Sequence, residues 1–502
     1  MIDLSTRSSL KRSVRFLPYL LMIAYVSLSS DSYAQDQTSL PTKAKPVLTR
    51  GQAKETEGDP WLDTFWSVAK QVKNKRAQRA ITEVLKDPKK FRFQLLITEY
   101  DKDSDGVEHL TPHVFRVDQE YFYPASAIKT YASIAALRHF TLLRQKHKWL
   151  TTDDPMSPET KTCQKADKTN ELSALASLEH EIKKTQLISS NQAFNTVFDV
   201  TGFRQLHEYI LPDFPSVRVY HRLSSRETHE ESLRTPGLHI CDLRKGKINP
   251  KNSFMREKFT SQKEISDLVE AVAQERPQAP TGFGENRESL LIGQSYKDMK
   301  TKKLIKKPMD FSFKNRVSFF DFQRLNMAMY MPNRATDFGP AVKLLSVEAK
   351  SDSELEPLIR KVWLSELRHA MAIYPRHSKN PKYSGASLSE TRFKPLIRGV
   401  RMADKKRLND EDLYYLNKAG KALGFHMDNA FIAYGKEAGG IRENGFPKRS
   451  PRRGLFITVG FYVNEDGTLN NDKYEYKKIS VPALDAIGYA VGRYLIGDWP
   501  QP

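Results

Sequence analysis

The chain has 502 residues, of which 39% are hydrophobic and 28% are charged. This composition excludes a disordered or fibrous chain, because a sequence of this length and apolar content buries a large core. The 80 basic residues outnumber the 60 acidic ones and give a formal charge of +20, which suits acidic partners such as nucleic acid, anionic lipid or an anionic wall polymer. Because the lysines are spread along the chain, a purely solubilising role is the simpler explanation.

The N-terminus has the pattern of a secretory signal peptide. Four basic residues within the first fifteen positions precede the apolar run 16–28, and small residues then lead to Ala34. We therefore expect cleavage after Ala34 and a secreted or periplasmic mature protein. The run is short for a membrane span, and no later stretch reaches about 18 uninterrupted apolar residues, so no stable membrane insertion is expected after cleavage. The polar residues 35–60 are predicted to form a disordered leader.

The first folded elements are predicted to be a helix and a β-hairpin. Residues 61–85 have helical periodicity, 91–100 alternate like a strand, and 113–117 match its hairpin partner. The Asp-rich connection 101–106 imitates the start of a calcium-binding loop, but Pro112 stands where that loop needs a bidentate glutamate. A plain hairpin turn and no metal site are predicted.

Ser126 and Lys129 form an S-x-x-K motif at the mouth of an apolar helix predicted within residues 120–140. Residues at this spacing share a helix face, so the lysine amine can reach the serine hydroxyl and, if burial lowers its pKa, take the serine proton. The same spacing recurs at two other places, in the targeting segment and on a solvated stretch. The alternative for this copy is a helix N-cap serine and a surface lysine.

A second polar motif, Ser189-Ser190-Asn191, lies within the predominantly helical residues 172–198. Taken alone, Ser189 is a good N-cap and Asn191 a first-turn residue. A strand hairpin, an S-x-x-K that opens a buried helix and then an S-x-N resemble the class A β-lactamase and penicillin-binding-protein family of serine hydrolases.

This resemblance implies a role for each of the four polar residues. Ser126 would be the acylated nucleophile and Lys129 its base. Ser189 would help to pass a proton to the leaving nitrogen, and Asn191 would bind the amide side chain of the substrate.

The family's third motif, K-[T/S]-G on a strand beside the nucleophile, has no regular copy here. The best candidate is Lys436, at the end of the strand-like run 429–440, with Gly439 one place later than expected and Glu437 where a hydroxyl is expected. Residues 454–464 would pair with this run antiparallel. Lys382, before Tyr-Ser-Gly, is the competing candidate.

Class A β-lactamases also use a loop glutamate to activate the water that hydrolyses the acyl-enzyme. Glu227, Glu230 and Glu231 are available within residues 221–238, where the family's E-x-x-L-N signature is absent. Glu231, four residues before Thr235-Pro236, is the candidate. A solvated loop carboxylate is the alternative for each of them.

Residues 249–421 exceed what a compact enzyme of this family needs and are expected to form an elaboration. Helices are predicted there over 262–274, 319–331 and 354–373, and a C-terminal helix over 482–496. Pieces of sequence at 293–304, 311–325, 371–383 and 460–476 resemble a secreted branch of β-lactamase-like hydrolases. Cys163 and Cys241 fit either one disulfide after export or two reduced thiols.

Together these features predict one α/β-sandwich hydrolase domain over residues 61–502, with an antiparallel sheet and helices on both faces. The resemblance implies acyl-enzyme formation on β-lactams or D-Ala-D-Ala-like peptidoglycan amides. A DD-peptidase or transpeptidase, or a non-catalytic wall-binding module, are the alternatives. No cofactor, no metal and no nucleic-acid partner are expected, and a monomer is predicted.

Overall fold

The computed structural model describes residues 58–158, 176–244, 247–261, 267–268, 270, 290–331, 355–377, 390–436 and 438–500. The predicted signal peptide, the predicted leader up to residue 57, Cys163, Lys382, Glu437 and most of the helix predicted at 262–274 lie outside the described residues. Within the described part of the chain, no helix combines the length and the apolar character that a membrane span requires.

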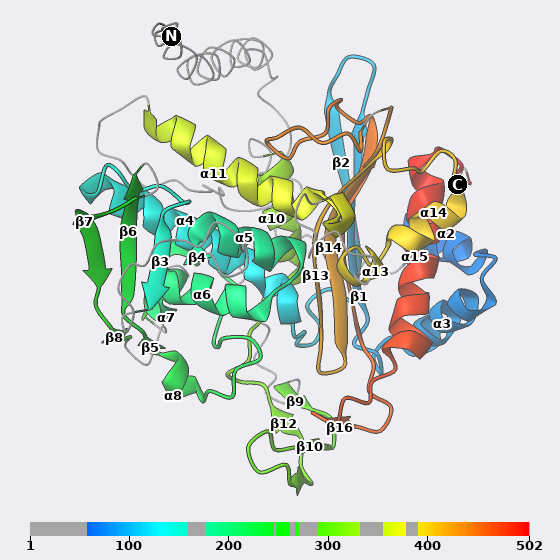
Figure 1. Cartoon of the computed structure of the whole chain (residues 1–502). Coiled ribbons are helices and arrows are strands. Elements are labelled where there is room, and N and C mark those ends of the chain that lie inside the picture. Colours follow the sequence, from blue (N-terminus) through cyan, green and yellow to red (C-terminus); the bar gives the residue numbers. More distant parts are fainter. Residues whose placement is uncertain are drawn as a thin grey trace, which may run out of the picture. The chain divides into compact units, whose positions relative to one another are not determined.

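A five-stranded antiparallel sheet, in the order β13-β14-β15-β1-β2, is the centre of the fold (Figure 1). Its strands are β1 (Gln94–Lys102), β2 (Glu108–Phe115), β13 (Leu413–Ala422), β14 (Phe425–Tyr434) and β15 (Arg453–Tyr462). Pairing of β1 with β15 brings the N-terminal and C-terminal strands side by side. The hairpin β1–β2 and the pair β14–β15 confirm that strands form at these places, but β2 begins five residues before the predicted range 113–117.

Both faces of this sheet are buried. Leu95 and Ile97 of β1 belong to one hydrophobic core, and Leu96 belongs to a second core on the opposite face. Successive side chains of a strand point to opposite faces, so a sheet that is covered twice needs apolar residues at consecutive positions. The mixed α/β sandwich predicted from the sequence is confirmed.

One face is covered by the helices α2 (Pro60–Lys70), α3 (Lys75–Lys86), α14 (Ile397–Ala403) and α15 (Val481–Leu495), which lie together at the right of the sheet in Figure 1. Pro482 at the start of α15 suits the first helical turn, where no backbone N–H is needed. The C-terminal helix therefore packs on the sheet as predicted. The single helix predicted at 61–85 is instead two, because Asn74 N-caps α3 with its side chain.

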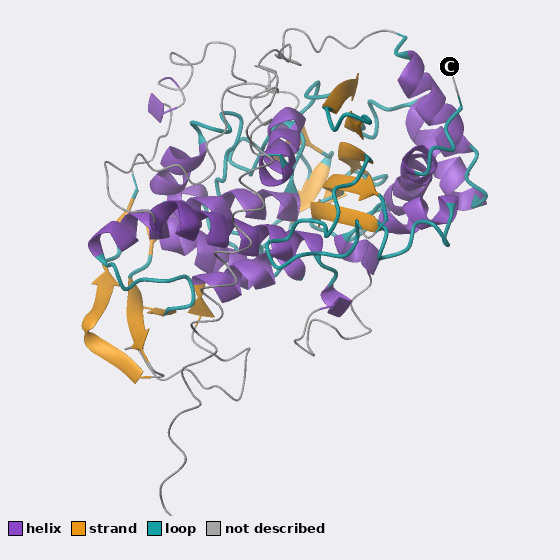
Figure 2. Ribbon diagram, turned by 90° about the horizontal axis from the view of Figure 1, so that it is seen from above, coloured by secondary structure: helices purple, strands orange, loops and turns teal. Residues whose placement is uncertain are grey.

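The other face carries a larger helical layer, and Figure 2 shows the sheet between the two groups of helices. This layer consists of the 3₁₀ turn η2 (Ala125–Ile128) and the helices α4 (Lys129–Lys146), α5 (Leu178–Leu187), α6 (Asn191–Thr201), α7 (Phe203–Ile210), α8 (His229–Ser232), α10 (Phe319–Tyr330) and α11 (Leu355–Ala372). The 3₁₀ turn η5 (Pro375–His377) and the helix α13 (Glu390–Phe393) lie beside α14, where Arg376 and Arg401 both pair with Glu390. Residues 129–141 of α4 are all buried, as expected of a helix surrounded by other elements. Helices α10 and α11 confirm the predictions at 319–331 and 354–373.

Small sheets and one short helix complete the fold. They are β3 (Pro155–Pro158), β4 (Ala176–Ser177), β6 (Leu238–Arg244) and β7 (Lys247–Arg256) in one sheet, β5 (Arg234–Thr235) with β8 (Phe259–Thr260), β9 (Leu291–Ile292) with β12 (Met309–Asp310), β10 (Ser295–Lys297) between β11 (Leu304–Ile305) and β16 (Thr468–Leu469), and the π-helix η6 (Tyr476–Ser480). Cys241 of β6 is buried and disulfide-bonded.

Two further sequence predictions are refined. The helical stretch predicted over 172–198 is divided into α5 and α6 by residues 188–190. The strand β13 lies almost wholly inside the range 249–421 that was assigned to an elaboration, although it is part of the central sheet.

The Asp-rich connection 101–106 is a hairpin turn, as predicted. In it the Asp103 carboxylate accepts the N–H groups of Asp105 and Val107.

Candidate active site

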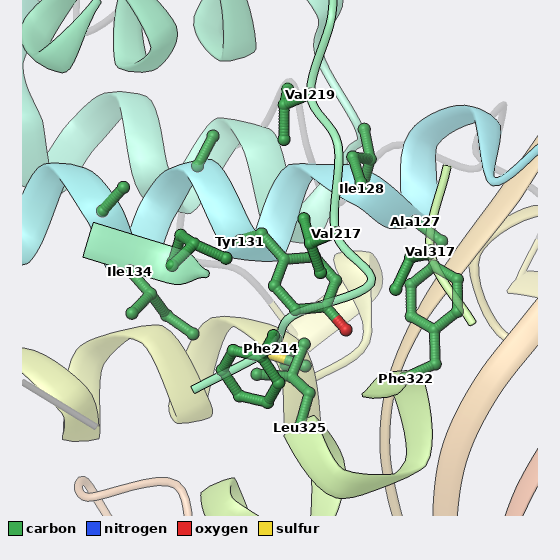
Figure 3. Close-up of a cluster of buried hydrophobic side chains, with 14 of the residues drawn as sticks. Ala127, Ile128, Tyr131, Ile134, Phe214, Val217, Val219, Val317, Phe322 and Leu325 are labelled. Atoms are coloured by element: carbon green, nitrogen blue, oxygen red, sulfur yellow. The ribbon is translucent and has the colours of Figure 1, made fainter. Parts of the chain in front are cut away.

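Ser126 lies in the short turn η2, directly before the buried helix α4. The preceding residue, Ala125, has φ +47°, a left-handed conformation that residues with a Cβ rarely adopt. Packing of the following residues holds the turn: Figure 3 shows Ile128 and Tyr131 in a cluster of buried side chains with Phe214 and Val217. Strained backbone that the surrounding core enforces is typical of functional sites.

The strand β13 touches this turn at Gly420. A Cβ at Gly420 would lie 2.1 Å from the carbonyl oxygen of Pro124 and 3.0 Å from the backbone nitrogen of Ala127. Only glycine permits this approach, because any side chain would collide with backbone atoms. Gly420 therefore brings the residues of β13 next to Ser126.

Lys129, the first residue of α4, is fully buried. Its Nζ lies 2.5 Å from the carbonyl oxygen of Ser189, 3.2 Å from the Ser189 Oγ and 2.7 Å from Oδ1 of Asn191. Burial lowers the pKa of Lys129 to about 5, and the nearby charges of Lys418 and Arg392 act in the same direction. The amine is therefore neutral at pH 7 and can accept a proton.

Ser189 lies between two lysines. Its hydroxyl is 3.2 Å from the Nζ of Lys129 and accepts a hydrogen bond from the Nζ of Lys418 at 3.0 Å. Its φ is +57°, a second left-handed residue with a side chain in the same site. The N-cap of α6 is Ser190, whose Oγ accepts the N–H of Ala193, so the capping alternative for Ser189 is wrong.

Asn191 connects Lys129 to the loop that precedes α8. Its Oδ1 accepts from Lys129, and its Nδ2 donates to the Ser224 hydroxyl at 2.5 Å. Ser224 has φ +55°, so the loop is held in a strained conformation where it meets the site. The structure thus brings together the four polar residues that the sequence motifs identified: Lys129 contacts both Ser189 and Asn191, and Ser126 lines the same cavity as Ser189 and Asn191.

Lys418 is the site residue that the sequence analysis missed. It lies on β13 in the tripeptide Lys418-Ala419-Gly420, and burial lowers its pKa to about 7. Ala419 occupies the place of the hydroxyl residue in a K-[T/S]-G pattern. A signal was present in the sequence, because a K-x-G sits in an apolar run that ends at the two-residue turn Leu423-Gly424, where both residues have positive φ.

Lys436 and Gly439, which the sequence analysis assigned to substrate binding, lie elsewhere. Tyr434, just before Lys436, pairs with Leu413, seven residues along β13 from Gly420 and therefore about 23 Å away. Lys436 is exposed in the turn after β14. Gly439 is enclosed by backbone, since a Cβ there would lie 1.7 Å from the carbonyl oxygen of Asp410. The assignment of both residues is wrong because the strand runs away from the nucleophile.

Glu231, the predicted base for deacylation, serves the short helix α8 instead. Its carboxylate accepts the N–H of Thr228 at 2.7 Å in a capping box. That hydrogen bond is the main cause that lowers the pKa of Glu231, and the charge of Lys300 contributes. Glu227 pairs with Arg222 at 3.0 Å.

Ser126, Ser189, Asn191 and Lys418 line a cavity of about 170 Å³. Its polar lining consists of Ser126, Gln186, Ser189, Asn191, Arg392, Lys394, Asn417, Lys418, Lys421 and His426. Among the described residues that line it there are four cationic side chains and no carboxylate. The cavity therefore suits an anionic molecule.

A buried polar network supports β13 behind the cavity. Lys394 donates to the carbonyl oxygen of Tyr415 at 2.6 Å, and Asn417 donates to Oδ1 of Asp428 at 2.7 Å. Burial lowers the pKa of Lys394 to about 7 and raises that of Asp428 to about 6. Because these buried groups are hydrogen-bonded to one another and to the backbone of β13, they hold in place the strand that carries Lys418.

Comparison with solved structures finds similarity to several β-lactamases. The β-lactamase of Sphaerobacter thermophilus is 11% identical, with a TM-score of 0.34 over 82% of this chain and 95% of that one. The β-lactamase of Burkholderia vietnamiensis is 10% identical, with a TM-score of 0.36 over 83% and 96%. The class A β-lactamase of Clostridium kluyveri is 12% identical, with a TM-score of 0.34 over 83% and 99%.

Neither the protein-family models nor the curated proteins include a match to the sequence. At this level of identity the structural likeness concerns the fold alone. The roles of individual residues depend on the geometry of the site, in which Ser126, Ser189 and Lys418 line one cavity and Lys129 contacts Ser189 behind it.

Proposed function

We propose that the protein is a serine hydrolase that forms an acyl-enzyme with β-lactams or with D-Ala-D-Ala-like amides of peptidoglycan. The observation that carries the proposal is the shared hydroxyl of Ser189, which lies within hydrogen-bonding distance of both Lys129 and Lys418 in the cavity lined by Ser126. A buried lysine with a pKa of about 5 is a base that works at neutral pH.

In the proposed reaction Ser126 Oγ attacks the amide carbonyl and Lys129 accepts the serine proton. The Ser189 hydroxyl then relays a proton from Lys129 to the amide nitrogen, so the C–N bond breaks and an ester to Ser126 remains. The backbone N–H groups of Ser126 and of the residue after Gly420 are the proposed donors to the oxyanion. Lys418 is the proposed partner of a substrate carboxylate.

The lining of the cavity favours slow hydrolysis of this ester. Efficient deacylation requires a general base that activates water, and no described residue lining the cavity is a carboxylate. The Glu231 carboxylate already accepts the N–H of Thr228 in the capping box of α8. We therefore favour the penicillin-binding form of the proposal, a DD-peptidase or transpeptidase type of enzyme with a long-lived acyl-enzyme, over a fast β-lactamase.

The proposed location is outside the cytoplasm. Peptidoglycan is built there, and the N-terminal sequence has the pattern of a secretory signal. The disulfide bond of Cys241 supports this location, because structural disulfides persist mainly in oxidising compartments.

The test is intact-mass measurement of the mature chain after incubation with benzylpenicillin. We expect a mass increase of one β-lactam that persists for many minutes, and no increase for Ser126→Ala. A matched pair separates catalysis from helix capping: Ser189→Ala should slow labelling by orders of magnitude, whereas Ser190→Ala should cost about 1 kcal/mol of stability and label normally. An unlabelled wild type with an intact fold, or labelling of Ser126→Ala, contradicts the proposal.

A further inference from the structure

A lysine-rich hairpin stands apart from the candidate active site. We define the lysine hairpin as residues 295–310, which include β10, β11 and β12. This segment contains six lysines and two aspartates. In Figure 1 it lies at the lower edge, away from the helices that cover the central sheet. Nearly all of residues 297–310 are exposed.

The base of the hairpin is attached firmly to the body of the fold. The strand β10 pairs in parallel with β16, and the Ser295 hydroxyl lies 2.9 Å from that of Thr468. The N–H of Gln294 donates to the carbonyl oxygen of Gly467 at 2.7 Å, and Asn470 Nδ2 donates to the carbonyl oxygen of Lys297 at 3.1 Å.

The tip of the hairpin is equally well defined. Oδ1 of Asp298 accepts the N–H groups of Lys300 and Thr301, at 3.0 and 2.6 Å, and the N–H of Asp298 donates to the carbonyl oxygen of Lys303 at 2.9 Å. Lys302 has φ +61°, which closes the turn. These hydrogen bonds fix the backbone of the turn from which the exposed side chains project.

Apolar side chains are exposed among these lysines. Met299 at the tip is 44% exposed, Leu304 beside it is 51% exposed, and Leu291 on the adjoining β9 is 47% exposed. Three large apolar side chains with this exposure around one hairpin leave unfavourable surface in contact with water. Lysines alone would bind any polyanion. The apolar side chains add to the free energy of binding only where the partner offers an apolar phase in which they are buried.

We propose that the lysine hairpin binds the surface of an anionic lipid bilayer. The lysines would lie at the level of the phosphate groups, and Met299 and Leu304 would enter the boundary between headgroups and acyl chains. The charge of the hairpin is complementary to such a surface, because its six lysines outnumber its two aspartates. This proposal does not depend on the proposed acyl transfer.

The test is co-sedimentation of the full mature chain with large vesicles. Vesicles of phosphatidylcholine with one quarter phosphatidylglycerol should bind the protein, and pure phosphatidylcholine vesicles should bind it far less. The triple variant Lys300→Gln, Lys302→Gln, Lys303→Gln should lose about a hundredfold in affinity, since each lysine near such a surface contributes about fivefold.

The apolar residues are tested separately. The double variant Met299→Ser, Leu304→Ser should lose about tenfold while it keeps all its lysines. Matched controls are Val107→Ser with Met402→Ser, which are exposed elsewhere, and Lys89→Gln with Lys405→Gln and Lys406→Gln. Both controls should bind as the wild type does, and melting temperatures should show that every variant is folded.

Three results overturn the proposal. The first is a wild type that does not bind the anionic vesicles. The second is binding that the control variants weaken as much as the hairpin variants do. The third is binding that depends on the lysines but not on Met299 and Leu304, which would identify a soluble polyanion, such as a nucleic acid or a wall polymer, as the partner of the hairpin.

Discussion

Lys129 and Lys418 both lie within hydrogen-bonding distance of the Ser189 hydroxyl, and burial lowers the pKa of each. With values of about 5 and about 7, Lys129 is neutral and Lys418 is half charged at pH 7. Two buried lysines this close cannot both carry a charge without a large penalty, so the arrangement favours one base and one cation. The proposed acyl transfer to Ser126 requires both, a neutral base for the serine proton and a cation for the substrate carboxylate.

The acylation rate should therefore have a bell-shaped pH dependence. Below a pH of about 5 Lys129 is protonated and cannot accept the serine proton, so the rate falls as the pH drops through that value. Above a pH of about 7 Lys418 loses the charge that attracts a carboxylate, so the rate falls again as the pH rises. Stopped-flow measurement of acylation by a chromogenic cephalosporin across this range checks both limbs.

Two conservative variants assign the limbs of this profile. Lys129→Arg keeps a positive charge that is not lost at any of these pH values, so acylation should fall by orders of magnitude throughout. Lys418→Arg should retain acylation and remove the alkaline limb. If that limb persists in Lys418→Arg, another group, such as Lys394 with a pKa of about 7, controls it.

Arg392 should set a preference for substrates with a second negative charge. It lines the cavity, is exposed, and its charge lowers the pKa of both Lys129 and Lys421, which places it near both amines. Carbenicillin is benzylpenicillin with one additional carboxylate. Arg392→Gln should slow acylation by carbenicillin several-fold more than acylation by benzylpenicillin, as followed by intact mass. An equal loss for both compounds would assign Arg392 to the common carboxylate or to the fold.

The single residues of the site differ in how far the sequence predicted them. Ser126, Lys129, Ser189 and Asn191 lie in two short motifs, where spacing along one helix or one turn determines which side chains meet. Lys418 comes from a distant strand, and Ala419 removes the hydroxyl that marks its motif. Lys436 was chosen because its strand is apolar and ends in glycines, but the direction of that strand relative to Ser126 is a property of the whole sheet.

At the scale of elements, the contact between β13 and η2 determines where the nucleophile lies relative to Lys418. Gly420→Ala should displace the strand, because its Cβ would lie 2.1 Å from the carbonyl oxygen of Pro124. We expect a loss of about 2–4 kcal/mol in the free energy of unfolding and a loss of most acylation at temperatures where the variant is still folded. Thermal unfolding and labelling by benzylpenicillin measure the two effects.

Gly435→Ala is the matched control for this variant. It follows the neighbouring strand β14, and its Cβ would lie 3.4 Å from the Cα of Pro451, an ordinary van der Waals contact. Its stability and labelling should stay close to those of the wild type. Normal labelling of Gly420→Ala would show that the close contact between β13 and η2 is not needed for the site.

Elements with one clear local signal were predictable from the sequence. The β-branched and aromatic residues of β1, the apolar runs of β14 and β15 and the proline at the start of α15 each reflect a local physical preference. The breaks between α2 and α3 and between α5 and α6 were missed, because apolar periodicity continues across both and only the N-cap residues Asn74 and Ser190 mark them. Capping side chains are common in loops, so this signal is weak.

At the scale of the whole molecule, one sheet separates two cores that come from distant parts of the sequence. The pairing of β1 with β15 joins residues more than 350 positions apart, so the sheet is completed only by the C-terminal part of the chain. The range 249–421 extends too far towards the C-terminus for a different, local reason: β13, which pairs with β14 across the two-residue turn Leu423-Gly424, was not recognised as a strand.

A shared sheet predicts that both cores unfold together. Leu484 of α15 is fully buried in the core between the sheet and α15, on the face opposite α10. Leu484→Ala should lower the free energy of unfolding by about 2–5 kcal/mol, since it leaves a cavity. Acylation by benzylpenicillin should be unchanged well below the melting temperature, and the temperature at which it disappears should fall by the same amount as the calorimetric melting temperature.

Leu304→Ala, which changes an exposed leucine, should alter neither temperature. If labelling survives above the calorimetric transition of Leu484→Ala, the helical layer that holds Ser126 folds independently of α15, and the sheet does not couple the two cores.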